Sequence, residues 1–117
     1  AYYTTNALIR VAFTGSGANA VTYYSCKQRI VNGSPRNCTP IGTGTYTIET
    51  MGEARVMKLN NPPVEATTLT YNRVFVEGRG KVYWGYQDKP STYQRARLNL
   101  TAANALFTQI GIPTVTP

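Results

Sequence analysis

The chain has 117 residues, of which only 15% are charged, and its 12 Lys and Arg outnumber its 5 Asp and Glu. This length predicts one globular domain with its own core, and the low charge together with nine Tyr and ten Gly favours a β-rich fold over a helical bundle. The absence of histidine excludes Ser-His-Asp and Cys-His catalysis and His-containing zinc sites. The net charge of +7 favours contact with anionic partners.

The first predicted element is a strand over residues 7–14. Its apolar residues alternate along one side: Ala7, Ile9, Val11 and Phe13. Residues 15–20 then match the Gly-x-Gly-x-x-Ala pattern of dinucleotide-binding folds, which requires a helix directly after the glycines. Residues 21–26 are instead β-branched and aromatic, so we interpret residues 15–20 as a hairpin turn.

The next predicted strand, over residues 20–31, contains the first of two cysteines. Eleven residues separate Cys26 from Cys38, and the Asn32-Gly33 turn between them would fold the chain back. We therefore predict a Cys26–Cys38 disulfide, which implies an oxidising compartment. The alternative is two unrelated buried thiols in a cytosolic protein.

Two further hairpins are predicted, with strands over 44–50 and 54–59, then 67–77 and 81–87. In the first, Tyr46 and Ile48 point inward, and the turn lies at residues 51–53. The segment 60–63, Asn-Asn-Pro-Pro, separates the two hairpins.

The second of these hairpins carries the candidate binding face. A three-residue loop at Gly78–Gly80 places Phe75 opposite Tyr83. One face is then a plain core face, made of Val74, Val76, Val82 and Trp84. The other face is aromatic and basic, and we predict a ligand-binding site there with these members: Tyr71, Arg73, Phe75, Tyr83, and at the hairpin tip Arg79 and Lys81.

Aromatic rings interleaved with arginine suit a ligand that has planar rings and negative charge. The competing interpretation is structural, with this face covered by a helix or enclosed in a barrel.

After residue 90 the periodicity becomes helical. Asn99 can cap a helix over residues 100–110, and Gly111 can end it. We expect residues 1–112 to form a single domain and residues 113–117 to be an extended tail.

The strand Gly-Thr-Tyr-Thr-Ile at 44–48, followed by hairpins and one C-terminal helix, resembles small lipocalin-like barrels in style. The resemblance implies a mainly β fold: a small antiparallel β-barrel or a strongly curved sheet with one C-terminal α-helix. The Gly-x-Trp signature of those proteins is missing, because the sole tryptophan is Trp84. No ligand pocket is carried over.

The acidic residues give little support for catalysis. Glu49 and Glu53 flank one turn, but solvent at a hairpin tip would screen both carboxylates. We therefore expect no enzyme activity, no cofactor and no metal site.

These observations predict an extracytoplasmic, non-catalytic binding module (periplasmic, cell-surface or secreted) whose partner is a glycan or another polyanion. The alternative is a structural or assembly module that self-associates or joins domains of a larger surface protein. A cytosolic nucleic-acid binder would require free thiols, and nucleic acid is not the expected partner. No apolar run is long enough to span a bilayer, so membrane insertion is not expected either.

Overall fold

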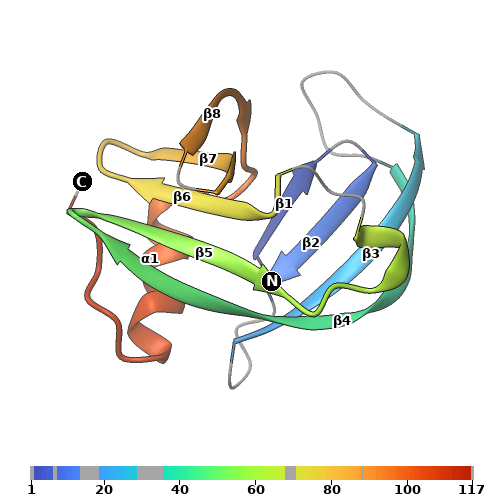
Figure 1. Ribbon diagram of the computed structural model, residues 1–117, viewed down its shortest axis with the longest axis horizontal. Helices are drawn as coiled ribbons and strands as arrows, with labels where there is room; N and C mark the ends of the chain where they lie inside the picture. The colour runs from blue at the N-terminus through green and yellow to red at the C-terminus, as the bar shows by residue number, and fades with distance from the viewer. Residues whose placement is uncertain are drawn as a thin grey trace.

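The computed structural model describes residues 2–6, 8–13, 19–28, 36–67, 71–87 and 89–116. They form one antiparallel sheet, a short 3-10 helix η1 (Val64–Ala66) and one α-helix, α1 (Leu100–Gln109) (Figure 1). The strands are β1 (Tyr2–Asn6), β2 (Ile9–Phe13), β3 (Ala20–Gln28), β4 (Arg36–Met51), β5 (Ala54–Asn60), β6 (Arg73–Glu77), β7 (Lys81–Tyr86) and β8 (Lys89–Arg95).

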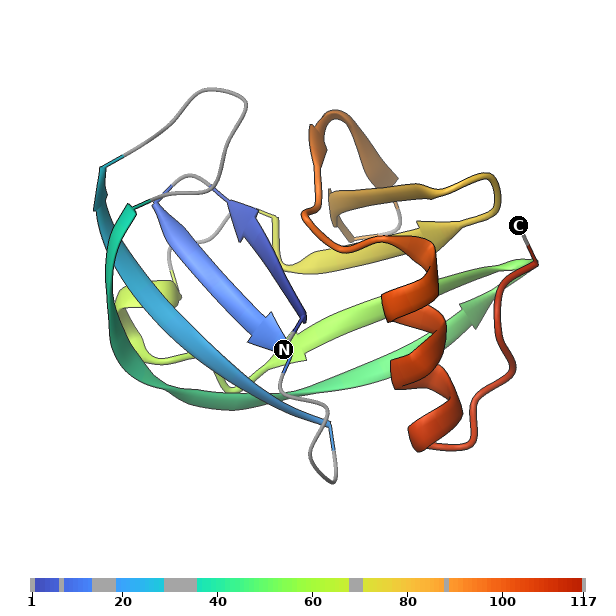
Figure 2. The same cartoon turned by 180° about the vertical axis from the view of Figure 1, so that it is seen from behind.

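The eight strands lie in the sheet in the order in which they occur along the chain, from β1 to β8. The sheet is strongly curled but open, since β1 and β8 stand at opposite ends of this order (Figure 1). The prediction of a mainly β fold with one helix is confirmed, whereas a closed barrel is wrong. Instead of barrel closure, α1 packs on the inner side of the sheet, where it lies in front of β4 and β5 in Figure 2.

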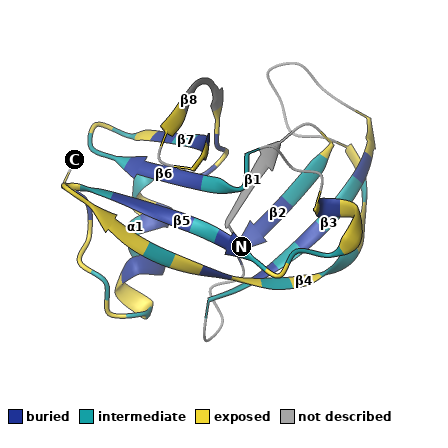
Figure 3. Cartoon of the chain, viewed as in Figure 1, coloured by how far each residue is buried: buried dark blue, intermediate teal, exposed yellow. Residues whose placement is uncertain are grey.

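The core lies between the inner face of the sheet and α1. Alternating residues of the strands supply one side of it, such as Val11 and Phe13 of β2 and Val74 and Val76 of β6. Figure 3 shows buried, dark blue segments in β2, β5 and β6. From α1 come Leu106 and Phe107, both fully buried. The rings of Phe13 and Tyr46 meet edge to face, with their centroids 5.1 Å apart.

The predicted pairing of the β6–β7 hairpin is confirmed at every position. Val74 lies opposite Trp84, Phe75 opposite Tyr83, and Glu77 opposite Lys81. The three-residue loop has positive φ at Arg79 (61°) and Gly80 (71°). The core face is also confirmed, since Val74, Val76, Val82 and Trp84 are all buried.

Other elements differ from the prediction. The sequence patterns do not predict strands β1 and β8, and β6 begins at Arg73 rather than at residue 67. Strand β3 follows the glycine-rich segment, so the helix that a dinucleotide site requires is absent at Ala20–Gln28. Residues 15–18 of that segment and the Asn32-Gly33 turn lie outside the described residues.

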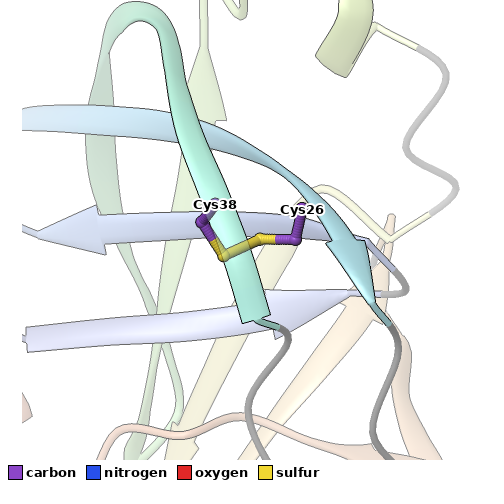
Figure 4. Close-up of a disulfide and its surroundings, with 2 residues drawn as sticks. All are labelled: Cys26 and Cys38. Carbon is purple, nitrogen blue, oxygen red and sulfur yellow. A yellow bond between two sulfur atoms is a disulfide. The ribbon is translucent and has the colours of Figure 1, made fainter.

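The predicted disulfide is confirmed. Cys26 of β3 and Cys38 of β4 are directly opposite each other, with their Cα atoms 4.0 Å apart (Figure 4). The bridge joins the strands two residues beyond the point where their register shifts, between Tyr23 and Tyr24.

The helix has the ends that the sequence predicts. The Asn99 side chain accepts a hydrogen bond from the backbone N–H of Ala102 (2.7 Å), and Gly111 has a positive φ of 78° after the last turn. Among the described residues, no helix is both long and apolar enough to cross a membrane.

The chain after α1 is anchored to the domain at Val115. The Asn104 side chain bonds both backbone groups of Val115: its Nδ2 donates to the carbonyl oxygen (3.0 Å), and its Oδ1 accepts from the N–H (2.8 Å). The Val115 side chain is buried in the core. We call residues 112–116 the C-terminal segment; it runs back beside the helix toward the β4–β5 turn (Figure 2).

Candidate functional site

The candidate site lies on the outer face of the sheet, opposite the core. Residues that lie directly opposite one another in neighbouring strands form a row across five strands, from β4 to β8. Its members are Glu49, Val56, Phe75, Tyr83 and Arg95. Their sequence neighbours in β5, β6 and β7, such as Met57 and Val74, are in the core, so this row faces outward.

The adjacent row on the same face brings two cations together. Lys58 of β5 lies directly opposite Arg73 of β6, and both are half-buried. Arg73 donates from Nη1 to the Oδ1 of Asn72 at 2.7 Å. Within the described part of the chain, neither Lys58 nor Arg73 forms an ion pair with a carboxylate. Two like charges directly across a sheet repel each other.

Phe75 is on the expected face but is not available to a ligand. Its side chain is only 1% exposed, and its ring lies over Gly85 of the neighbouring strand. The ring therefore covers the sheet and contributes to packing. The exposed aromatic surface that the sequence analysis expected here is reduced to Tyr83, which is half-buried.

Tyr71 lies apart from the other predicted site residues. It precedes β6 and packs against the core cluster on the inner side. The alternation that placed it beside Arg73 assumed a strand from residue 67, whereas the observed strand begins at Arg73. Tyr71 is therefore not part of the outer face.

Arg79 and Lys81 are exposed at the tip of the β6–β7 hairpin. They are separated from Arg73 by the length of β6, which at about 3.3 Å per residue is roughly 20 Å between positions 73 and 79. The tip and the outer face are thus two basic areas rather than one.

Two cations that the sequence analysis missed complete the outer face. Lys58 is there because of the β5–β6 pairing, and Arg95 because β8 adds a strand beyond β7. We call the four residues that result the outer basic face: Lys58, Arg73, Tyr83 and Arg95.

A second pair of an arginine and an aromatic ring lies elsewhere on the outer side. Arg10 of β2 is directly opposite Tyr24 of β3, and its guanidinium carbon is 5.6 Å from the centre of the Tyr24 ring. This distance is within the range of a cation–π contact, so Arg10 already has an aromatic partner within the protein.

Comparisons with protein-family models, with curated proteins and with solved structures found no match to this chain. The described residues contain no group of three or more Cys, Asp or Glu side chains arranged to hold a metal ion. The chemistry of the outer basic face is that of a surface that attracts anions.

Proposed function

We propose that this chain is a non-catalytic binding module that acts outside the cytoplasm and holds an acidic glycan or another acidic polymer on the outer basic face. The observation that carries the proposal is the Lys58–Arg73 pair. Opposed like charges destabilise a sheet, and neither residue forms an ion pair with a carboxylate within the described part of the chain. A bound anion would offset this repulsion.

The spacing of the cations supports a polymer rather than a single small anion. Neighbouring strands lie about 4.8 Å apart, so Lys58, Arg73 and Arg95 occupy β5, β6 and β8 across roughly 15 Å of the face. Tyr83, between Phe75 and Arg95 in the row, adds a phenol beside the cations. The excess of positive charge over the whole chain would increase the rate of encounter with a polyanion.

The compartment is part of the same proposal. A disulfide in a chain of this size is typical of proteins in oxidising environments, such as the periplasm, the cell surface or the extracellular space. Acidic polysaccharides are abundant ligands of the appropriate chemistry in these places.

The test uses heparin as the acidic polysaccharide and compares two double variants that remove the same charge. Lys58→Gln/Arg73→Gln alters the outer basic face, and Lys27→Gln/Arg36→Gln removes two exposed cations near the disulfide. We expect titration calorimetry to show heparin binding that weakens with salt, and the first double variant to lose affinity about tenfold or more while the second stays near wild type.

Three outcomes would overturn this proposal. These are no binding of heparin, an equal loss in both double variants, or binding of a neutral oligosaccharide that persists at high salt. The last result would assign the face to sugar stacking instead of charge.

A second candidate function is assembly through strand pairing, and the open sheet favours it. Within the described chain β1 pairs only with β2, and its sequence, Tyr-Tyr-Thr-Thr-Asn, has no charge and no proline. The opposite edge strand, β8, contains Lys89, Pro90 and Arg95, which discourage pairing with another chain. Oligomers that dissociate on dilution in light scattering, and that Thr4→Pro abolishes, would support assembly through β1. A monomer at all concentrations would exclude it.

A further inference from the structure

A second group of buried apolar residues lies on the outer side of the sheet, apart from the core. Val56 and Phe75 are only 2% and 1% exposed, although the strand register places both on the outer face. Neither is a member of the core cluster that includes the residues of α1. Gly85 is also buried, and the Phe75 ring lies over it. We call Val56, Phe75 and Gly85 the outer apolar cluster.

Members of the outer basic face surround this cluster. Phe75 lies directly opposite Val56 on one side and directly opposite Tyr83 on the other, where Cβ atoms are usually about 4.5–5.5 Å apart. Arg73 is two residues before Phe75 in β6, and Lys58 is two residues after Val56 in β5. Residues two apart in a strand point to the same face. Three of the four members of the outer basic face therefore adjoin the outer apolar cluster.

The exposure of these three neighbours agrees with packing onto the cluster. Lys58, Arg73 and Tyr83 are all half-buried, although they belong to the outer face. Long cationic side chains lay their methylene groups along apolar surface and keep the charged end in water. Partial burial of all three side chains is the result expected when their apolar parts rest on Phe75 and Val56.

Arg73 is also held at its charged end. Its Nη1 donates to the Oδ1 of Asn72 at 2.7 Å, and the backbone carbonyl oxygen of Asn72 accepts a hydrogen bond from the N–H of Leu59 at 3.1 Å. The partner of the guanidinium is therefore itself tied to β5. With the Phe75 ring beside its stem, Arg73 has little freedom to leave the face.

We propose that Phe75 is a positioning residue of the outer basic face. Its ring supports Arg73 and Tyr83 in the arrangement that receives an anion, and it does so without touching the ligand. The proposal rests on the proposed function, because it concerns the same face. A side chain that is already ordered loses less conformational freedom on binding. Removal of the ring should therefore weaken polymer binding although every charge remains.

The first test compares heparin binding to two variants of neighbouring residues in β6. Phe75→Leu removes the ring from the outer side and keeps all cations, whereas Val74→Ala removes atoms from the core side of the same strand. Titration calorimetry is performed at a temperature at which circular dichroism shows both variants folded. We expect Phe75→Leu to bind heparin about threefold to tenfold more weakly than wild type and Val74→Ala to bind like wild type. Unaltered affinity in Phe75→Leu, or an equal loss in Val74→Ala, would overturn the proposal.

The second test measures side-chain order by NMR without heparin. Exchange of the Arg73 Nε–H with water should be slow in wild type and faster in Phe75→Leu, while Arg79, exposed at the hairpin tip, should be unchanged. Arg73 exchange as fast as that of Arg79 in wild type would refute the positioning role even if heparin binds. If wild type does not bind heparin while Arg73 is ordered, the proposed function fails, and the order of Arg73 reflects packing alone. Heparin binding that is equal in wild type and Phe75→Leu would refute only the role of Phe75.

Discussion

The ring of Phe75 occupies the space that a side chain at position 85 would need. A Cβ atom at that position would overlap Cε1 and Cδ1 of Phe75 and lie 2.7 Å from the carbonyl oxygen of Lys89. The two residues are diagonal neighbours, since Phe75 is opposite Tyr83 and Gly85 is opposite Arg73. An aromatic ring over a glycine of the next strand restores the packing that the glycine lacks.

Gly85→Ala should therefore destabilise the protein by about 2 kcal/mol, because the added methyl group overpacks a filled site. Urea denaturation of Gly85→Ala, Phe75→Leu and the double variant provides the check. A leucine side chain at position 75 is smaller and makes room for the methyl group. The double variant should therefore lose less free energy of unfolding than the sum of the losses in the two single variants. Strictly additive losses would contradict the contact.

The Cys26–Cys38 bridge should contribute about 3 kcal/mol to stability by restricting the unfolded chain. Cys26→Ala/Cys38→Ala should unfold at correspondingly lower urea concentration, and wild type in reductant should match it. Thiol alkylation followed by mass spectrometry verifies the oxidation state of each sample. An unchanged midpoint after complete reduction would show that the bridge does not stabilise this fold.

Asn104 should anchor the C-terminal segment through its two hydrogen bonds to Val115. Asn104→Ala is expected to cost about 1–2 kcal/mol in denaturation and to accelerate hydrogen exchange at the Val115 N–H. Gln109→Ala, an exposed position on the same helix, serves as the control. Equal stability and equal hydrogen exchange at Val115 in the two variants would show that the Asn104 hydrogen bonds do not anchor the C-terminal segment.

Tyr23 should make stability fall at alkaline pH. Its side chain is fully buried, and burial raises the pKa of Tyr23 from 10.0 to about 12; the pKa of Tyr46 is raised for the same reason. Above pH 10 the unfolded chain loses the Tyr23 proton while the native protein retains it. The stabilisation is therefore complete below pH 10 and decreases toward pH 12, by at most about 1.4 kcal/mol per pH unit.

The check is the free energy of unfolding between pH 9 and pH 12 for wild type and Tyr23→Phe. The free energy of unfolding of Tyr23→Phe should depend less steeply on pH than that of wild type, because the buried phenylalanine ring does not ionise. Parallel curves would mean that Tyr23 ionises alike in both states.

The β6–β7 hairpin was predictable in full because a short glycine-flanked loop fixes which residues are opposite. The two edge strands, β1 and β8, were not predictable from the sequence. Strand β8 contains a proline, and β1 is uniformly polar and aromatic, so neither has the alternation that identifies a half-buried strand.

The outer basic face was predictable only in part. Arg73 and Tyr83 follow from the hairpin, whereas Lys58 requires the β5–β6 register, which no short turn fixes. The burial of Phe75 depends on a glycine in the neighbouring strand, and strand parity alone does not reveal that contact. The hydrogen bond from Arg55 to Pro113 joins residues that are 58 positions apart, and no local pattern in the sequence predicts it.

The agreement between strand order and chain order also bears on how the molecule folds. Each strand finds its partner in the strand synthesised just before it, so no strand has to be inserted between two that are already paired. Pairing of this kind closes only short loops at each step and keeps the entropic barrier of each step low. Hairpins can therefore form in succession from the amino end, whereas the contact of Arg55 with Pro113 joins residues 58 positions apart and closes a much longer loop.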